Sequence, residues 1–298
     1  MINEAANRIK AGELVAFPTE TVYGLGADAS NPLAVRQIFA LKGRPADHPL
    51  IVHLADASQL DAWAHATPLA HTLAQAFWPG PLTLVLKRRE TVLDEVTGGL
   101  DTIGIRVPRH PMARALLSQS GCGIAAPSAN RFGRVSPTRA DHVRTEFGDQ
   151  VFILDGGPCD VGIESTIIDL SGAPALLRPG GIPPEAISEI TGPLGSSKTI
   201  APGTLASHYA PKTSLLLCDD ADKEAARLRA RGLNVAILRA TDLRSHAQNL
   251  YAQLRILDQD SVDILVAERA TNQGLGLAIN DRLARAATPP DSKGEGST

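Results

Sequence analysis

The first residues whose side chains could take part in binding or catalysis lie in a short basic loop. Lys42, Arg44, His48 and His53 lie in one stretch of sequence that leads into an apolar segment. Two prolines between them restrict the backbone and stiffen the loop. A stiff loop loses little conformational freedom on binding, which suits the capture of phosphate or carboxylate groups. The alternative, which the residue types alone favour, is a basic loop that is merely solvated.

Two further polar residues interrupt apolar segments. Arg106 lies within residues 103–107, where an unpaired charge would be costly. Its planar guanidinium fits a carboxylate, which either belongs to an acidic residue of this chain or to a substrate. His53 alternates with Val52, so we expect the two on opposite faces of a strand. A lone strand histidine is more often structural than catalytic.

Small and hydrogen-bonding residues end another apolar segment, at Ala126, Ser128 and Asn130. Small side chains let a ligand approach the backbone, and open sheets bind ligands at strand ends. Ser136 either caps a helix or lies where a helix N-terminus attracts phosphate, and the two roles are compatible. Arg178 stands before Pro-Gly-Gly, as an ordinary turn arginine or as a cation at a strand end.

The familiar nucleotide-binding and metal-binding motifs do not match this sequence. Residues 195–199 resemble part of a phosphate-binding loop, but the spacing of GxxxxGK[ST] is wrong. Gly274 and Gly276 lack the third glycine of a dinucleotide fingerprint. The sequence has no HExxH, GxSxG or EF-hand loop. A nucleotide site would therefore have to be built from the basic residues above.

Apolar periodicity predicts the elements that place these side chains. Residues 19–26 are expected to form a loop, because two glycines there allow unusual backbone angles. We expect strands at 14–17, 50–54, 82–86, 103–107, 123–126, 151–154, 166–170 and 175–178, and helices near 5–11, 32–42, 58–64, 68–78, 112–118, 138–147 and from 184. Alternating elements with hairpin-like pieces indicate an α/β or α+β domain around a mixed sheet.

The composition divides the chain of 298 residues, which is long enough for two domains. Residues 1–191 form the predicted catalytic domain. Residues 192–213 are rich in Gly, Pro, Ser and Thr and are predicted to be a linker. Residues 214–288 follow a β-α-β-α-β-α pattern, typical of a small Rossmann-like parallel unit. Residues 289–298 are expected to be a flexible tail.

Composition also excludes several classes of protein. The net charge is −3 and no run of Lys or Arg exists, so wholesale binding to nucleic acid is not indicated. Cys122, Cys159 and Cys218 lie far apart, which argues against a disulfide framework or zinc site and fits a reducing cytoplasm. The sequence shows no signal peptide and no stretch of about 20 apolar residues, so we expect no membrane partner.

Taken in order, a set of short motifs resembles the YrdC-like family of threonylcarbamoyl-AMP synthases, in its long two-domain form. Single motifs are weak, whereas the ordered set is specific and extends over nearly the whole chain. Two departures are an Ala-Pro-Gly-Thr linker where Ser-Pro-Gly-Met is common, and His48 where asparagine is frequent. The matching segments are 18–25, Lys42 with Arg44, 49–53, 78–83, 105–108, 128–130, 164–167, 177–180, 201–211 and 274–280.

The resemblance implies an enzyme that makes threonylcarbamoyl-adenylate for tRNA modification next to the anticodon. Bicarbonate and the threonine amine give a carbamate, whose oxygen attacks the α-phosphate of ATP so that pyrophosphate leaves. Such a reaction needs positioning and charge stabilisation rather than a protein nucleophile. The implied cofactor is magnesium, held mainly by phosphate oxygens and water. The implied partners are L-threonine, bicarbonate, ATP, a downstream tRNA threonylcarbamoyl-transfer complex and, through the family's basic concave face, RNA.

Site roles carry over by motif position. Lys42 and Arg44 would be the catalytic pair, and alanine variants of Arg44 and Arg106 are expected to lose most activity while remaining folded. Asn130 would support the Ser128 loop, and Tyr209 would fold back as a lid on the nucleotide. The implied threonine-binding residues are Thr21, His53, Arg106 and Thr166. The implied ATP-binding residues are Arg44, His48, Thr102, Ala126, Ser128, Ser136, Arg178 and Tyr209.

Two rival interpretations remain. A carbamoyltransferase of hydrogenase maturation carries a similar domain, but it adds zinc-binding CxxC repeats and an acylphosphatase module that this sequence lacks. A non-catalytic RNA-binding module would use the same basic face. An assay of pyrophosphate release separates the module from the enzyme.

Overall fold

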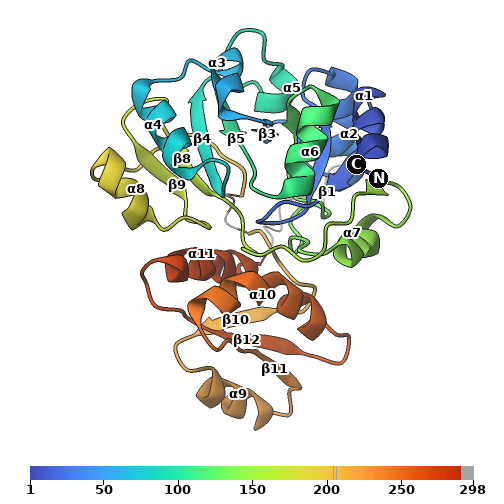
Figure 1. Ribbon diagram of the computed structural model, residues 1–298. Helices are drawn as coiled ribbons and strands as arrows, with labels where there is room; N and C mark the ends of the chain where they lie inside the picture. Colours follow the sequence, from blue (N-terminus) through green and yellow to red (C-terminus); the bar gives the residue numbers. More distant parts are fainter. Residues whose placement is uncertain (204, 206, 290–298) are drawn as a thin grey trace, which may run out of the picture.

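The computed structural model describes residues 1–203, 205 and 207–289, which form two domains, each built on its own sheet (Figure 1). The larger sheet takes its strands from the first part of the chain and the smaller one from the last. Apart from Pro289, the predicted flexible tail lies outside the described residues. Within the described ranges, no helix has the length and apolar character needed to cross a bilayer.

In the described residues the larger sheet has nine strands in the order β7-β1-β2-β6-β3-β5-β4-β8-β9. Parallel pairs such as β3 with β5 occur in the same sheet as antiparallel pairs such as β4 with β5, so the prediction of a mixed sheet is confirmed. The strands are β1 (Val15–Phe17), β2 (Gly24–Asp28), β3 (Ile51–His53), β4 (Leu82–Lys87), β5 (Thr102–Arg106), β6 (Ile124–Ala125), β7 (Phe152–Ile153), β8 (Thr166–Asp169) and β9 (Ala175–Arg178).

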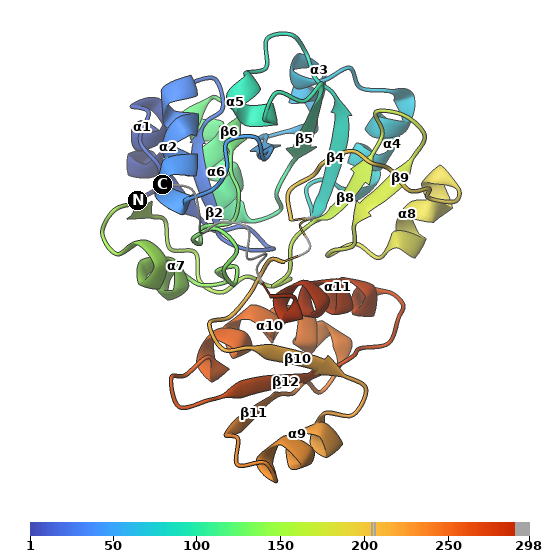
Figure 2. The ribbon, with the colours of Figure 1, turned by 180° about the vertical axis from the view of Figure 1, so that it is seen from behind.

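Helices cover both faces of this sheet (Figures 1 and 2). Val15 and Phe17 of β1 pack into a core with α1 and α6, whereas Ala16 between them packs into the larger core with α2 and α4. This alternation is the period of two that a strand imposes. The helices are α1 (Ile2–Lys10), α2 (Pro32–Lys42), η1 (Ala57–Gln59), α3 (Leu60–Trp63), α4 (Pro68–Phe77), α5 (Asp94–Thr97), α6 (Pro111–Ser120), α7 (Ala140–Phe147) and α8 (Pro184–Thr191).

The smaller sheet is parallel, with β10 (Leu215–Cys218), β12 (Ile264–Glu268) and β11 (Val235–Leu238) in that order. This confirms the small Rossmann-like unit. Helix α9 (Ala221–Arg229) covers its outer face, and α10 (Leu243–Leu257) and α11 (Leu275–Ala287) lie between the sheet and the first domain (Figures 1 and 2).

The two domains share a buried apolar cluster. Val22, Val135 and Ile163 of the first domain pack with a group that includes Tyr251 and Ile279 of the second. Burial of this kind makes the contact between the domains part of the folded core.

The predicted loop over residues 19–26 is wrong in its last part, where β2 begins at Gly24. A Cβ at Gly26 would lie 2.7 Å from Ile124 and 2.8 Å from Phe17. These glycines therefore allow neighbouring residues to approach the strand closely. Helix α5 was not predicted, because four residues carry too little periodicity.

Candidate functional site

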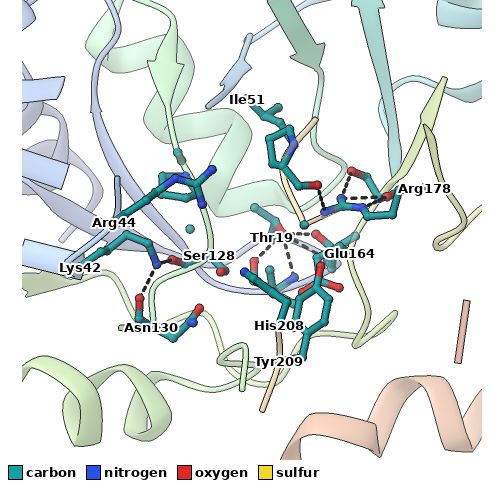
Figure 3. Close-up of a pocket in the computed structure, with 18 of the residues that line it drawn as sticks. Thr19, Lys42, Arg44, Ile51, Ser128, Asn130, Glu164, Arg178, His208 and Tyr209 are labelled. Atoms are coloured by element: carbon teal, nitrogen blue, oxygen red, sulfur yellow. Dashed lines mark hydrogen bonds between the residues drawn. The ribbon is translucent and has the colours of Figure 1, made fainter. Parts of the chain in front are cut away.

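One pocket collects basic side chains from distant parts of the chain (Figure 3). It has a volume of about 650 Å³ including its open mouth. Lys42 and Arg44 lie on one side and Arg178 on the other, with Thr19, His208 and Tyr209 between them (Figure 3). The predicted site residues that line it are Thr21, Lys42, Arg44, His53, Arg106, Ala126, Ser128, Asn130, Arg178 and Tyr209.

Helix α2 leads to two of these basic residues, with Lys42 as its last residue and Arg44 two positions further on. The Asn31 side chain accepts hydrogen bonds from the backbone of Leu33 and Ala34, and Gly43 ends the helix at φ 65°. Lys42 is buried, and its Nζ donates to the carbonyl oxygens of Ser128, at 2.7 Å, and Asn130. Burial, reinforced by the neighbouring Arg44, lowers the pKa of Lys42 well below its ordinary value. Lys42 thus fixes the loop that carries Ser128.

Arg44 is a buried cation without a carboxylate partner among the described residues. One Nη donates to the carbonyl of Pro49 at 2.9 Å, and Nε has no hydrogen-bond partner in the same part of the chain. The guanidinium carbon lies 5.9 Å from the centre of the Phe132 ring. Burial lowers the pKa of Arg44 to about 10, so the group stays charged at neutral pH. A buried charge with spare donors is suited to an anionic ligand.

Arg106 pairs with Glu20, which answers the question that the sequence left open. Its Nη2 lies 2.5 Å from the Glu20 carboxylate, Nη1 lies 2.8 Å from Thr21 Oγ1, and Nε donates to the Gly80 carbonyl at 3.2 Å. Burial alone would raise the pKa of Glu20, but Arg106 outweighs it and lowers that pKa. Three of five guanidinium donors are used, which leaves two for a ligand.

Glu164 and Arg178 form the opposite wall. Arg178 donates to the Ser165 carbonyl and, at 2.9 Å, to the carbonyl of Pro202. Glu164 accepts hydrogen bonds from Ser136 at 2.7 Å and from Arg282 at 2.7 Å. Burial would raise the pKa of Glu164, but Arg282 and Arg178 outweigh burial and bring it to about 2. Glu164 is therefore ionised at neutral pH.

Part of the linker closes the pocket. We call four of its pocket-lining residues the lid: Pro202, Gly203, His208 and Tyr209. Tyr209 is buried and adopts φ 60°, which a residue with a side chain rarely does. Its hydroxyl has no partner in the described residues, and neither has Nδ1 of His208.

Further partnerless polar atoms around the pocket point to a ligand. Among the described residues, these are Nδ1 of His53 and Oδ1 of Asn130, in addition to Nε of Arg44. Buried polar atoms are nearly always hydrogen-bonded, because leaving one unpaired costs about 1–3 kcal/mol. Several such atoms in one pocket are expected where ligand atoms complete the hydrogen bonds.

Four predicted site residues do not line the pocket. Thr102 begins β5, whereas Arg106 ends it, so the two lie about 13 Å apart at roughly 3.3 Å per residue. The Thr166 hydroxyl exchanges hydrogen bonds with the backbone of Ile182. Ser136 lies behind Glu164. The His48 ring lies against the ring of Phe132, which does line the pocket, with ring centres 5.5 Å apart.

Sequence reasoning gave no role to several residues that line or support the pocket. Glu20 and Glu164 lay in quoted motifs, but nothing in the sequence showed which cations they face. Arg282 was missed altogether. The available signal was its position on the apolar stripe of α11, beside Ile279 and Leu283, where a charge needs a buried partner.

Acid is expected to destabilise the fold through buried histidines of the site. Burial lowers the pKa of both His53 and His208 to about 3 from an ordinary value of 6.5. Below pH 6.5 the unfolded chain binds protons at these histidines that the folded chain does not bind. The free energy of unfolding therefore decreases as the pH is lowered. Each histidine contributes roughly 1.4 kcal/mol per pH unit.

Urea unfolding at pH 6.0 and 5.0 tests this expectation. The variant His53→Gln should lose stability less steeply than the wild type by about one histidine's contribution. His71→Gln, at an exposed position on α4, serves as the control and should keep the wild-type slope. Equal slopes for His53→Gln and the wild type would show that folding does not lower the pKa of His53.

Comparison with known proteins places the chain in a family. A family model described as "Telomere recombination" matches residues 7–180. A second, described as "Threonylcarbamoyl-AMP synthase, C-terminal domain", matches residues 182–288. Together the two models account for both domains.

Individual relatives match over almost the same extent. The threonylcarbamoyl-AMP synthase of Bacillus subtilis is 42% identical, with 96% of this chain and 92% of the relative covered. The synthase of Schizosaccharomyces pombe is 35% identical, with 96% and 88% covered. The crystal structure of Pyrococcus abyssi Sua5 complexed with L-threonine superposes with a TM-score of 0.90 at 43% identity, covering 96% of this chain and 94% of that one. The chain therefore belongs to the threonylcarbamoyl-AMP synthase family, in its two-domain form.

Proposed function

We propose that the pocket is where this chain joins L-threonine, bicarbonate and ATP into threonylcarbamoyl-AMP, with release of water as the carbamate forms and of pyrophosphate as it is adenylated. The observation that carries the proposal is the convergence of Lys42, Arg44, Arg106 and Arg178 on one pocket. Each substrate carries at least one negatively charged group, namely the threonine carboxylate, bicarbonate or the ATP phosphates, and a basic pocket offsets the repulsion between these groups. The relative whose structure holds L-threonine supports the choice of amino acid.

Threonine would bind beside Thr21, His53 and Arg106. Arg106 offers the carboxylate of threonine the two N–H donors that are not used by Glu20, Thr21 and Gly80. His53 is neutral because of its lowered pKa, so its partnerless nitrogen can accept a hydrogen bond from the threonine amine or hydroxyl. Thr166 would act on this side indirectly, through its place in β8 next to Ser165.

ATP would lie between Arg44 and Arg178, along Ala126 and Ser128. The carbamate oxygen forms a bond to the α-phosphorus, the bond from that phosphorus to the bridging oxygen breaks, and pyrophosphate carries away the charge. Arg44 would stabilise this charge as it develops, because its donors are held in place before the reaction. Lys42 would keep the Ser128 loop in register through its two hydrogen bonds to backbone carbonyls. The reaction then needs no group of the protein to form a covalent bond.

Magnesium would enter as part of the substrate, on the phosphate oxygens of ATP. The pocket offers no free carboxylate in its described residues, because Glu20 and Glu164 both accept hydrogen bonds on both oxygens. No cluster of three potential metal-binding side chains occurs in those ranges. A small cation that keeps its water and binds phosphate fits such a site.

The lid would exclude water from two labile species, the carbamate and the mixed anhydride of the product. The product would pass to a tRNA threonylcarbamoyl-transfer complex, and direct contact with RNA belongs to the same proposal. Three free cysteines support a reducing, cytoplasmic location.

Pyrophosphate release with each substrate omitted in turn tests the proposed function. We expect release only when threonine, bicarbonate and magnesium–ATP are all present. Release that does not depend on threonine would indicate a different acceptor. RNA binding without any turnover would favour the RNA-binding module.

Gly203 offers a direct test of the lid. It adopts φ 75°, and a Cβ there would lie 2.3 Å from Tyr209 Oη and 2.6 Å from Arg178 Nη1. We expect Gly203→Ala to lower kcat/KM for ATP roughly ten- to a hundredfold, because the lid tyrosine is displaced. The measurement is steady-state pyrophosphate release, with the melting temperature recorded in parallel.

Gly192→Ala is the matched control. Gly192 also lies in the linker at positive φ, but a Cβ there would meet nothing within 4 Å. It carries the same kind of backbone strain without the clash, so its activity should stay near that of the wild type. Equal activities of the two variants would remove the lid from the account.

A further inference from the structure

We propose that the C-terminal domain completes the catalytic site through Arg282, a positioning residue that fixes Glu164 and the closed lid. This inference rests on the proposed function and assigns the second domain a part in it. Arg282 belongs to α11, whereas Glu164 and the pocket belong to the first domain.

Arg282 is the only arginine in the described residues with no exposed surface. Nε donates to Glu164 Oε2 at 2.7 Å, Nη1 lies 2.5 Å from Asp281, and Nη2 donates to the Pro179 carbonyl at 3.0 Å. Pro179 follows Arg178, so the bond to its carbonyl ties α11 to the end of β9. A buried arginine with this many fixed partners is held rigidly, which suits positioning.

At the pocket wall, Arg282 holds the carboxylate of Glu164 in place. Its Oε2 accepts hydrogen bonds from Arg282 and from the hydroxyl of Tyr251 at 2.8 Å, while Oε1 accepts from Ser136. Tyr251 belongs to α10, so two helices of the second domain reach one carboxylate. Ser165, the next residue, accepts hydrogen bonds from Arg178. A displaced Glu164 would therefore also displace a cation on the ATP side.

The lid tyrosine is held by the same two helices. The Tyr209 ring stacks on the ring of Tyr251, with centres 5.7 Å apart and planes 28° apart. The guanidinium carbon of Arg282 lies 5.2 Å from the centre of the Tyr209 ring. Arg282 thus contacts both the wall and the lid, whereas the threonine side, with Glu20, Thr21 and Arg106, is held by contacts within the first domain.

This asymmetry predicts that loss of Arg282 affects the use of ATP and the binding of threonine differently. Loss of Arg282 should loosen the ATP side and the lid but leave threonine binding intact. A general loss of structure would weaken binding of both substrates together. Weaker use of ATP with unchanged threonine binding would therefore indicate that Arg282 is a positioning residue, because a purely structural role does not produce this combination.

The experiment uses the full-length chain and three variants. Arg282→Lys keeps the charge and loses the planar fork. The double variant Arg282→Met with Glu164→Gln removes both buried charges, so neither partner is left uncompensated. Arg269→Met is the control, because Arg269 pairs with Asp219 on the exposed side of the C-terminal domain.

We expect kcat/KM for ATP to fall at least tenfold in Arg282→Lys and in the double variant, while the dissociation constant of L-threonine stays within twofold of the wild type. Protease should also cleave the linker faster in these two variants, and Arg269→Met should behave as the wild type. Wild-type turnover by a folded double variant would overturn the inference, as would a parallel loss of threonine affinity. Linker cleavage and threonine binding need no turnover, so they test the inference even where wild-type protein releases no pyrophosphate.

Discussion

Replacing Arg44 with alanine is expected to lower kcat/KM by about a hundredfold or more while the protein stays folded. The loss corresponds to the roughly 3–4 kcal/mol that a preorganised donor to developing charge supplies. Folding is spared because Arg44 has no carboxylate partner in the described residues, so its removal leaves no uncompensated buried charge. Steady-state pyrophosphate release and a thermal melt measure both halves of this expectation.

Arg36→Ala is the matched control for Arg44. Arg36 lies on α2, the helix that ends just before Arg44, but its side chain is exposed and pairs with Glu95. Exposed pairs of this kind contribute about 0–1 kcal/mol, and Arg36 does not line the pocket. Its variant should turn over normally. Normal turnover by Arg44→Ala as well would remove Arg44 from the catalytic role.

The second large effect concerns stability and falls on Arg106. We expect Arg106→Met to lower the free energy of unfolding by about 3–5 kcal/mol, because it leaves the Glu20 carboxylate buried and unpaired. The sequence had suggested that an Arg106 variant would stay folded, and the buried pair changes that expectation. Urea unfolding at neutral pH measures the change.

A double variant separates the two roles of Arg106. Arg106→Met with Glu20→Gln removes the unpaired charge, so much of the stability should return while threonine binding stays weak. Arg109→Met is the control, because its exposed pair with Asp160 should contribute less than about 1 kcal/mol. Wild-type threonine affinity in the double variant would show that Arg106 serves the fold and not the substrate.

Sequence predicted best what local interactions determine. Helix α2 was placed correctly because its signals are contiguous: an Asn31 cap, a proline at the first position and a terminal Gly43. The same is true of His53 and Val52, whose opposite faces follow from strand alternation. The convergence of the basic motifs on one pocket followed from the resemblance and from strand ends meeting at one edge of a sheet.

What sequence missed depends on contacts between distant residues. Glu20 lies 86 positions from Arg106, and Glu164 lies 118 positions from Arg282, so no local pattern announces either pair. Gly24 and Gly26 were assigned to a loop because their reason is tertiary, namely space for Phe17 and Ile124. Thr102 was assigned to the nucleotide by motif position, although it begins a strand whose other end enters the pocket.

One basic pocket is expected to bring threonine, bicarbonate and ATP together and to let them react with each other. The most direct measurement incubates the protein with ¹³C-bicarbonate, ¹⁵N-threonine and magnesium–ATP and analyses the nucleotide products by mass spectrometry. We predict a threonylcarbamoyl-AMP that carries both labels, formed by the wild type and strongly reduced in Arg44→Ala. A nucleotide product that lacks the carbon label, or a doubly labelled product in equal yield from Arg44→Ala, would contradict the account.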